Sequence, residues 1–154
     1  METFDLGKGA FTDYDAHWLD SETASHLQAC LTEQMTWEQK PIYAFGKALM
    51  QPRLVAWAGD IPYRYSGQTL EPQPVSKVLA DLMHQVSITL GVPFNHVLLN
   101  RYRDGKDTMG MHADNEPELG KNPTIASISI GAKHRFQIKG KPGHNAKIAY
   151  EMWL

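Results

Sequence analysis

Two kinds of hydrophobic periodicity are separated along this chain, and their order restricts the folds it can adopt. Apolar residues recur at helical spacing from Pro74 to Leu90, whereas Ile125 to Ile130 alternates apolar and small polar residues with a period of two. Helical segments come first and most strand-like segments come later. This order predicts an α+β fold or a mainly β fold with added helices, rather than alternating βαβ units.

Start and stop signals place two helices before position 92. Asp20-Ser21-Glu22 is a helix start, and that helix is expected to continue to about Gln34. The second helix is expected from Pro74 to Leu90, where Gly91-Val92-Pro93 ends it. Short strands and ordered loops are expected from Pro41 to Tyr65. Further strands are expected at Val97–Tyr102, Ile125–Ile130, Phe136–Ile138 and Lys147–Tyr150.

Length and composition predict one globular domain over the 154 residues. Cys30 is the single cysteine, so no internal disulfide can form and a reducing compartment is expected. The N-terminus lacks the basic and apolar stretches of a secretory signal, and no apolar run reaches the ~20 residues of a membrane span. We therefore expect a monomeric protein of the cytoplasm, or of the nucleus in a eukaryote.

Charge is unevenly distributed around a formal net charge of -2. The first forty residues are mostly acidic, whereas the stretch from Lys121 to Lys147 carries basic residues and no acid. A basic face of this kind can bind phosphates. It can also be a solvated strand edge on which lysines discourage aggregation, and charge alone favours this second interpretation.

The pattern with the clearest chemistry is His112-x-Asp114. In an extended segment, side chains two residues apart point to the same side, so an imidazole and a carboxylate are presented together. One more histidine would complete the 2-His-1-carboxylate set of non-haem Fe(II) oxygenases, which leaves positions open for cosubstrate and oxygen. Taken alone, His-x-Asp is common and equally describes a surface turn.

The surrounding sequence resembles the AlkB-like family of Fe(II)- and 2-oxoglutarate-dependent dioxygenases. The run Leu99-Asn100-Arg101-Tyr102, followed by His112-x-Asp114 and Glu116-Pro117, is similar to the family's central signature. The stretches Pro123–Ala132 and Pro52–Gly67 are similar to its next strand and its substrate-side segment. Together these motifs cover roughly residues 40 to 140.

The resemblance implies a role for each matching residue. His112 and Asp114 would be the first two iron ligands, and Asn100 and Tyr102 would contact 2-oxoglutarate. Without the family, Asn100 and Tyr102 read as ordinary polar positions on a strand. Tyr63 and Tyr65 would line the substrate pocket, and Tyr65 would stack on a flipped base. Glu116 would lie near the damaged base. Without the family, the two tyrosines read as aromatics packed on a strand face.

The connection before His112 raises a question of register. Asp104-Gly105 is a two-residue hairpin signal. That turn would pair Asn100 with Met109. The His112 side chain would then point to the opposite face of the strand pair from Asn100 and Tyr102. A single site containing all these residues requires a longer connection, and we expect one through Arg103 to Asp107.

Two parts of the family pattern are not found in their usual context. Family members use a second histidine, and an arginine whose planar fork matches the cosubstrate carboxylate. His134, His144 and Arg135 follow Asp114, but none has the family's surroundings. Because the chain stops at Met152-Trp153-Leu154, within a strand-like segment, we expect either further residues that complete the site or a naturally shortened, inactive relative.

The fold implied is a double-stranded β-helix, or jelly-roll, with the two N-terminal helices packed on one side. Residues 1–92 would hold the helices and the substrate-recognition segment, and residues 93–154 the jelly-roll core. The implied activity is oxidative dealkylation of N-alkylated bases in DNA or RNA during alkylation repair. The alternatives are a non-catalytic nucleic-acid-binding relative, and a 2-oxoglutarate oxygenase that acts on a protein or small molecule.

Overall fold

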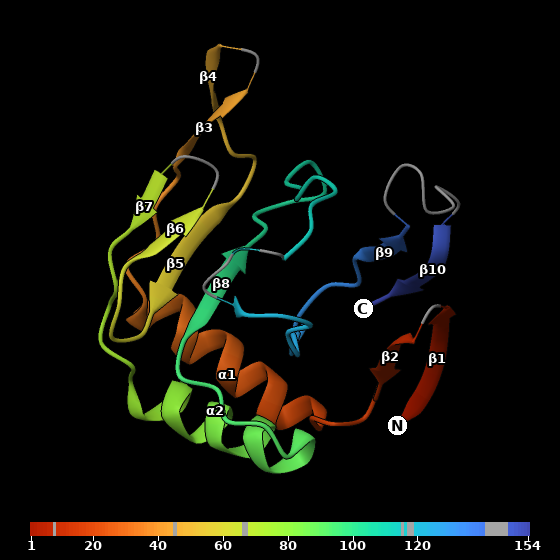
Figure 1. Cartoon of the computed structure of the whole chain (residues 1–154). Helices are drawn as coiled ribbons and strands as arrows, with labels where there is room; N and C mark the ends of the chain where they lie inside the picture. The colour runs from red at the N-terminus through yellow and green to blue at the C-terminus, as the bar shows by residue number, and fades with distance from the viewer. Residues whose placement is uncertain (8, 45, 66–67, 115, 117–118, 141–147) are drawn as a thin grey trace. The chain divides into compact units, whose positions relative to one another are not determined.

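The computed structural model describes residues 1–7, 9–44, 46–65, 68–114, 116, 119–140 and 148–154 (Figure 1). These residues contain two helices and ten short strands. The helices are α1 (Ser21–Gln34) and α2 (Lys77–Leu90). The strands are β1 (Glu2–Gly7), β2 (Ala10–Tyr14), β3 (Pro41–Ala44), β4 (Lys47–Met50), β5 (Leu54–Ala58), β6 (Tyr63–Tyr65), β7 (Gln68–Leu70), β8 (Val97–Arg101), β9 (Arg135–Lys139) and β10 (Ile148–Trp153).

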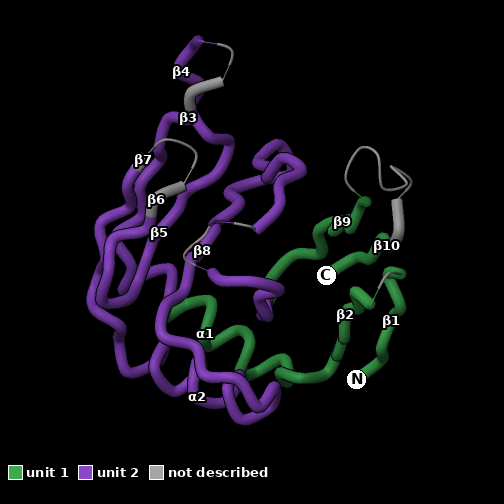
Figure 2. Tube along the Cα trace, in the orientation of Figure 1, with its two compact units in different colours: residues 1–30, 127–154 green, residues 31–126 purple. Residues whose placement is uncertain are grey.

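The chain divides into two compact units (Figure 2). One unit consists of residues 1–30 and 127–154, and the other of residues 31–126. The second unit contains every residue for which the sequence predicted an iron, cosubstrate or substrate role. The assignment of residues 1–154 to a single domain stays a prediction.

Both helices form where the sequence placed them, with one change of boundary. Asp20 caps α1, because its Oδ1 accepts a hydrogen bond from the backbone N of Thr23 at 2.7 Å. Helix α2 begins at Lys77 rather than at Pro74. The cause is Ser76, which has extended backbone angles and accepts the backbone N–H of Leu79 at its side chain. Gly91, with a φ of 64°, ends α2 in the left-handed conformation that glycine adopts most readily.

Strands β5 and β8 form the antiparallel pair on which the candidate site depends. Four of the five residues of β5 are buried, and Trp57 belongs to a core cluster with Val55 and Leu70. In this ladder Val55 lies opposite Asn100. The pair therefore holds a polar residue of β8 beside the apolar core of residues 31–126.

The other strands also pair two by two. The antiparallel pairs are β1 with β2, β3 with β4, β6 with β7, and β9 with β10. The expected mixture of helices and short strands is confirmed, including strands at Pro41–Tyr65, Val97–Arg101, Phe136–Ile138 and Ile148–Tyr150. Neither helix in the described part of the chain is long and apolar enough to cross a membrane.

The strand expected at Ile125–Ile130 is wrong for this structure. Within the described residues this segment pairs with no other strand, and Ile125 and Ile128 are exposed. Alternation makes one face of a segment apolar, but a strand also needs a neighbour that satisfies its backbone N–H and C=O groups. The sequence pattern supplied the first condition only.

Candidate active site

The connection after β8 is a compact loop rather than a two-residue hairpin. Strand β8 ends at Arg101, and in the described structure its ladder partner is β5 alone. Asp104 Oδ1 accepts the backbone N–H groups of Lys106 at 2.8 Å and Asp107 at 3.3 Å. Asp107 is itself buried and held by Arg103. The longer connection through Arg103 to Asp107 is confirmed.

A backbone hydrogen bond directs the chain onward from this loop. Thr108 donates its backbone N–H to the carbonyl of Pro52 at 2.8 Å. Pro52 lies two residues before β5, so the segment leading to His112 is tied to the start of that strand. Residues 108–114 then continue without helix or strand structure.

The His112 and Asp114 side chains converge, as their spacing predicted. His112 Nδ1 lies 3.0 Å from the carbonyl oxygen of Gly110. A carbonyl can only accept, so Nδ1 carries the proton and Nε2 keeps its lone pair when the ring is neutral. That Nε2 lies 3.4 Å from Asp114 Oδ1. Two electron-rich atoms thus face one another, an arrangement that a shared cation or a proton stabilises.

The donor set fits part of an iron site. Metal-binding histidines commonly donate the other ring N–H to a carbonyl or carboxylate, as His112 does to Gly110. Adjacent ligands of one transition metal lie about 3 Å apart, given bonds of about 2.1 Å, close to the separation seen here. Both side chains are about one third exposed, at 35% and 37%, so an ion can reach them from solvent.

The third iron ligand is not identified. The described residues contain no group of three or more His, Cys, Asp and Glu side chains suited to a metal ion. His134 pairs through its backbone with Leu154, and Arg135 opens β9, both in the unit of residues 1–30 and 127–154. His144 lies outside the described residues.

The cosubstrate residues predicted from the resemblance lie at the end of β8. Asn100 is half-buried, and its Oδ1 accepts a hydrogen bond from Arg53 Nε at 2.8 Å. Tyr102 follows the strand and is 38% exposed. Asn100 bonds to Arg53 and His112 to Gly110, so these two residues have different hydrogen-bond partners.

The predicted substrate residues have different surroundings. Tyr63 stacks on Trp57, with ring centroids 4.5 Å apart and planes at 17°, and packs against the core cluster. One face of its ring is therefore occupied by the protein. Tyr65 pairs with Gln68 through the backbone, and its side chain lies outside the described residues. Glu116 Oε2 is buried and accepts no hydrogen bond from the described residues.

Sequence reasoning missed two residues that organise this region. Arg53 is only 5% exposed and contacts Asn100, and Trp57 backs Tyr63 and donates its indole N–H to the Ile61 carbonyl at 2.7 Å. Both lie in the segment that resembles the family, but neither received a role. A charged residue next to the apolar run Leu54–Ala58 was the available signal for Arg53.

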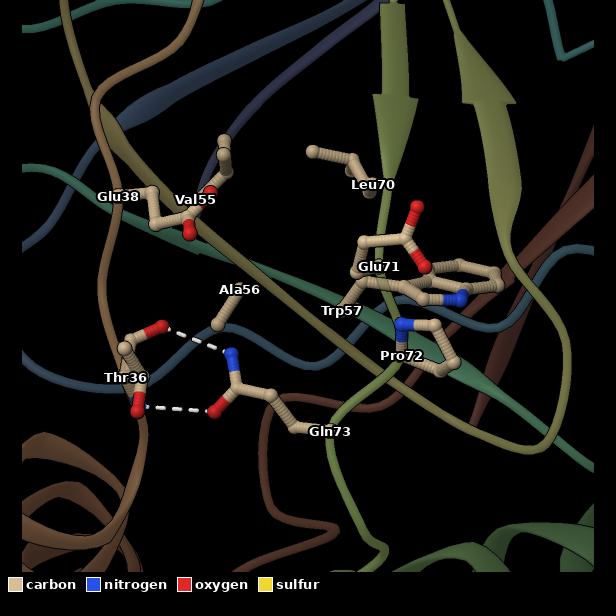
Figure 3. A pocket seen from close by; sticks show the side chains of 9 residues that line it. All are labelled: Thr36, Glu38, Val55, Ala56, Trp57, Leu70, Glu71, Pro72 and Gln73. Atoms are coloured by element: carbon tan, nitrogen blue, oxygen red, sulfur yellow. Dashed lines mark hydrogen bonds between the residues drawn. The ribbon is translucent and has the colours of Figure 1, made fainter.

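A small hollow lies beside Trp57 but not at these residues (Figure 3). It has a volume of ≈ 180 Å³, and its floor includes Gln73, whose side-chain amide bonds to the backbone N and O of Thr36 at 2.8 Å. The predicted iron, cosubstrate and substrate residues are not among those that line it. The hollow is lined by Thr36, Glu38, Val55, Ala56, Trp57, Leu70, Glu71, Pro72 and Gln73.

A family model described as the 2OG-Fe(II) oxygenase superfamily matches residues 13–153, nearly the whole chain. The chain belongs to the 2OG-Fe(II) oxygenase superfamily. Membership implies Fe(II) and 2-oxoglutarate as its cofactors, in agreement with the prediction from the sequence. His112, Asp114, Asn100 and Tyr102 all lie within the matched residues.

Curated relatives show which members of the superfamily the chain resembles. The chain is 39% identical over 126 residues to the Alpha-ketoglutarate-dependent dioxygenase alkB homolog 3 of Bos taurus, covering 81% of this chain and 44% of the relative. It is 43% identical over 102 residues to the DNA oxidative demethylase ALKBH2 of Homo sapiens, covering 65% and 39%. It is 32% identical over 148 residues to the Arabidopsis thaliana protein of that name, covering 91% and 46%.

The predicted resemblance to AlkB-like proteins is therefore confirmed. The chain spans less than half the length of these curated relatives.

Proposed function

We propose that this protein catalyses oxidative dealkylation of N-alkylated bases in DNA or RNA, as part of alkylation repair. The observation that carries the proposal is the convergence of His112 Nε2 and Asp114 Oδ1, with the Gly110 carbonyl fixing the ring nitrogen that bears the proton. The relatives named DNA oxidative demethylase ALKBH2 support a base as the substrate.

The protein's part is to hold and orient the reactants. His112 and Asp114 would supply two iron ligands, and Asn100 and Tyr102 would contact 2-oxoglutarate. Tyr63 and Tyr65 line the base pocket, where stacking on an aromatic ring recovers part of the cost of removing a base from the helix. The buried Oε2 of Glu116, which accepts no hydrogen bond from the described part of the chain, is suited to accept one from an exocyclic amine of that base.

The cofactors supply the oxidation. When bound, Fe(II) and 2-oxoglutarate would supply the chemistry by which one oxygen atom of dioxygen enters a C–H bond of the N-alkyl group and the other enters succinate, with loss of carbon dioxide. An N-methyl base thereby becomes a hemiaminal, which releases formaldehyde and the repaired base. The fold that we propose for this chemistry is the family's double-stranded β-helix, in a monomeric protein of the cytoplasm or nucleus.

Turnover on methylated oligonucleotides tests the proposal. We expect formaldehyde and unmodified base in amounts that match succinate, only when Fe(II), 2-oxoglutarate and dioxygen are all present. An anaerobic mixture with Fe(II) and 2-oxoglutarate should also show the weak charge-transfer band of the ternary complex. Folded protein that gives neither product nor band contradicts the proposal.

The same assay separates the alternatives. Strongly salt-dependent binding of nucleic acid that ignores Fe(II) and chelator indicates the non-catalytic relative. Its proposed basic face includes Lys133 and Lys139, which are exposed, whereas Lys141 and Lys147 lie outside the described residues. Succinate formation that methylated oligonucleotides do not stimulate indicates an oxygenase acting on a protein or small molecule.

A further inference from the structure

Arg53 is a buried charge with an unusual partner. It is 5% exposed, and it forms no ion pair with a described carboxylate. Its Nε instead donates to the neutral Asn100 side chain at 2.8 Å. Burying a cation is costly unless it is paired, so an arginine held against an amide points to a role other than stability.

The contact fixes which way the Asn100 amide faces. Arginine nitrogens can only donate, so the atom opposite Nε must be the carbonyl oxygen Oδ1. The two N–H groups of Asn100 Nδ2 are consequently directed away from Arg53. They are the donors through which Asn100 can bind an anionic ligand.

The positive charge also strengthens those donors. A hydrogen bond from a cation to the amide oxygen draws electron density from the amide nitrogen, and linked hydrogen bonds of this kind polarise one another. The effect is larger in a buried site, where solvent screens less. An anion bound at Asn100 Nδ2 therefore experiences the Arg53 charge through one intervening amide.

The backbone holds Arg53 at the junction of three segments. Pro52, the preceding residue, accepts the backbone N–H of Thr108 at 2.8 Å. Leu54, the following residue, pairs with Arg101 in the β5–β8 ladder. The residue thus lies where β5, β8 and the segment leading to His112 are joined.

We propose that Arg53 is a positioning residue for the cosubstrate: it orients and polarises the Asn100 amide, which in turn donates to a carboxylate of 2-oxoglutarate. The inference rests on the proposed function, because it assigns Asn100 to cosubstrate binding. It adds a role for Arg53 and predicts that this role operates through Asn100 alone.

Calorimetric binding of 2-oxoglutarate to the full chain, with Mn(II) in place of Fe(II) to prevent turnover, tests the proposal. Arg53→Met should weaken binding about tenfold or more, the usual scale for a hydrogen bond to a charged group. Arg53→Lys should restore part of the affinity, because it keeps the charge but not the planar fork. In an Asn100→Ala background, Arg53→Met should have no further effect.

Arg101→Met is the matched control. Arg101 neighbours Asn100 in sequence and lies over the Trp37 ring at 5.9 Å, and its removal changes net charge equally. We expect its affinity for 2-oxoglutarate to stay within about twofold, because an exposed charge is screened by solvent and salt. Equal losses in Arg53→Met and Arg101→Met would assign the effect to net charge and overturn the proposal.

Asn100→Asp tests the proposal in a variant that is expected to stay folded. A carboxylate at this position gives Arg53 an ionic partner, so resistance to urea should be kept or increased. Binding of 2-oxoglutarate should nevertheless be lost, because a carboxylate has no N–H to donate. Retained binding in this variant overturns the proposal.

Side-chain amide resonances give a readout that needs no ligand. In protein labelled with ¹⁵N-asparagine, the pair of peaks that disappears in Asn100→Asp belongs to Asn100. These peaks should move in Arg53→Met and stay in place in Arg101→Met. If they do not move in Arg53→Met, Arg53 does not hold the amide and the proposal fails.

The two failures are distinguishable. Wild-type protein that does not bind 2-oxoglutarate contradicts the proposed function and, with it, this inference. If wild-type protein binds 2-oxoglutarate and Arg53→Met binds it equally tightly, only the inference about Arg53 is contradicted.

Discussion

The Asp107 carboxylate accepts three hydrogen bonds from Arg103. Its Oδ2 accepts Nε at 2.7 Å and the backbone N at 2.9 Å, and its Oδ1 accepts Nη2 at 2.9 Å. This closes the loop that connects β8 to the segment carrying His112. The Arg103 hydrogen bonds, the side-chain one above all, lower the pKa of Asp107 to about 2 from 3.8.

This lowered pKa predicts a specific dependence of stability on pH. A carboxyl group that is more acidic in the folded state stabilises the fold above its unfolded pKa of 3.8, and the contribution is lost as pH falls through about 2. Asp107→Asn should therefore be less stable than wild type at pH 7, with a gap that narrows below pH 4. Urea unfolding between pH 7 and pH 2 measures the gap. If the difference in unfolding free energy stays constant with pH, Asp107 contributes through packing rather than charge. Asp60→Asn, at an exposed position, serves as the control.

Gly59 is required by a close approach to His96. A Cβ at position 59 would lie 2.8 Å from the His96 Cβ, and the His96 ring lies against Trp57 with centroids 4.8 Å apart and planes tilted by 40°. Gly59→Ala should therefore cost about 1–3 kcal/mol of unfolding free energy, the usual range for overpacking. In a His96→Gly background, Gly59→Ala should cost less than it does in the wild-type background. Chemical denaturation followed by tryptophan fluorescence measures both, and a Gly59→Ala protein as stable as wild type would contradict the contact.

Local signals predicted the helices because their causes are local. Asp20 and Ser76 cap helices through groups three residues away, and Gly91 ends α2 through its own backbone angles. The convergence of His112 and Asp114 is local in the same sense, since it depends on two side chains that are two residues apart. The expected start of α2 at Pro74 lies before the observed start at Lys77, because the cap is Ser76.

Features that depend on distant partners were not visible in the sequence. Arg53 and Asn100 are 47 positions apart, and their contact exists only because β5 pairs with β8. The segment Ile125–Ile130 has a strand's alternation, but alternation does not say which neighbour would accept its hydrogen bonds.

The Trp57–Tyr63 stack should appear as a coupling energy. Offset aromatic pairs contribute about 0.5–1.5 kcal/mol beyond the area that they bury. We therefore expect the combined loss in Trp57→Leu with Tyr63→Leu to be smaller than the sum of the single losses by that amount. Unfolding free energies of wild type, both single variants and the double variant supply the cycle. Strictly additive losses would show that the rings do not stabilise one another.

Metal binding should depend on His112 and Asp114 in a way that fold stability does not. Each side chain is about one third exposed, so His112→Ala or Asp114→Ala should change the unfolding free energy by only about 0.5 kcal/mol. Either substitution should abolish turnover and weaken Mn(II) binding at least about tenfold, because one ligand of the pair is removed. His84→Ala removes an exposed imidazole from α2 and should change neither property. Unchanged turnover in either variant would remove the site assignment.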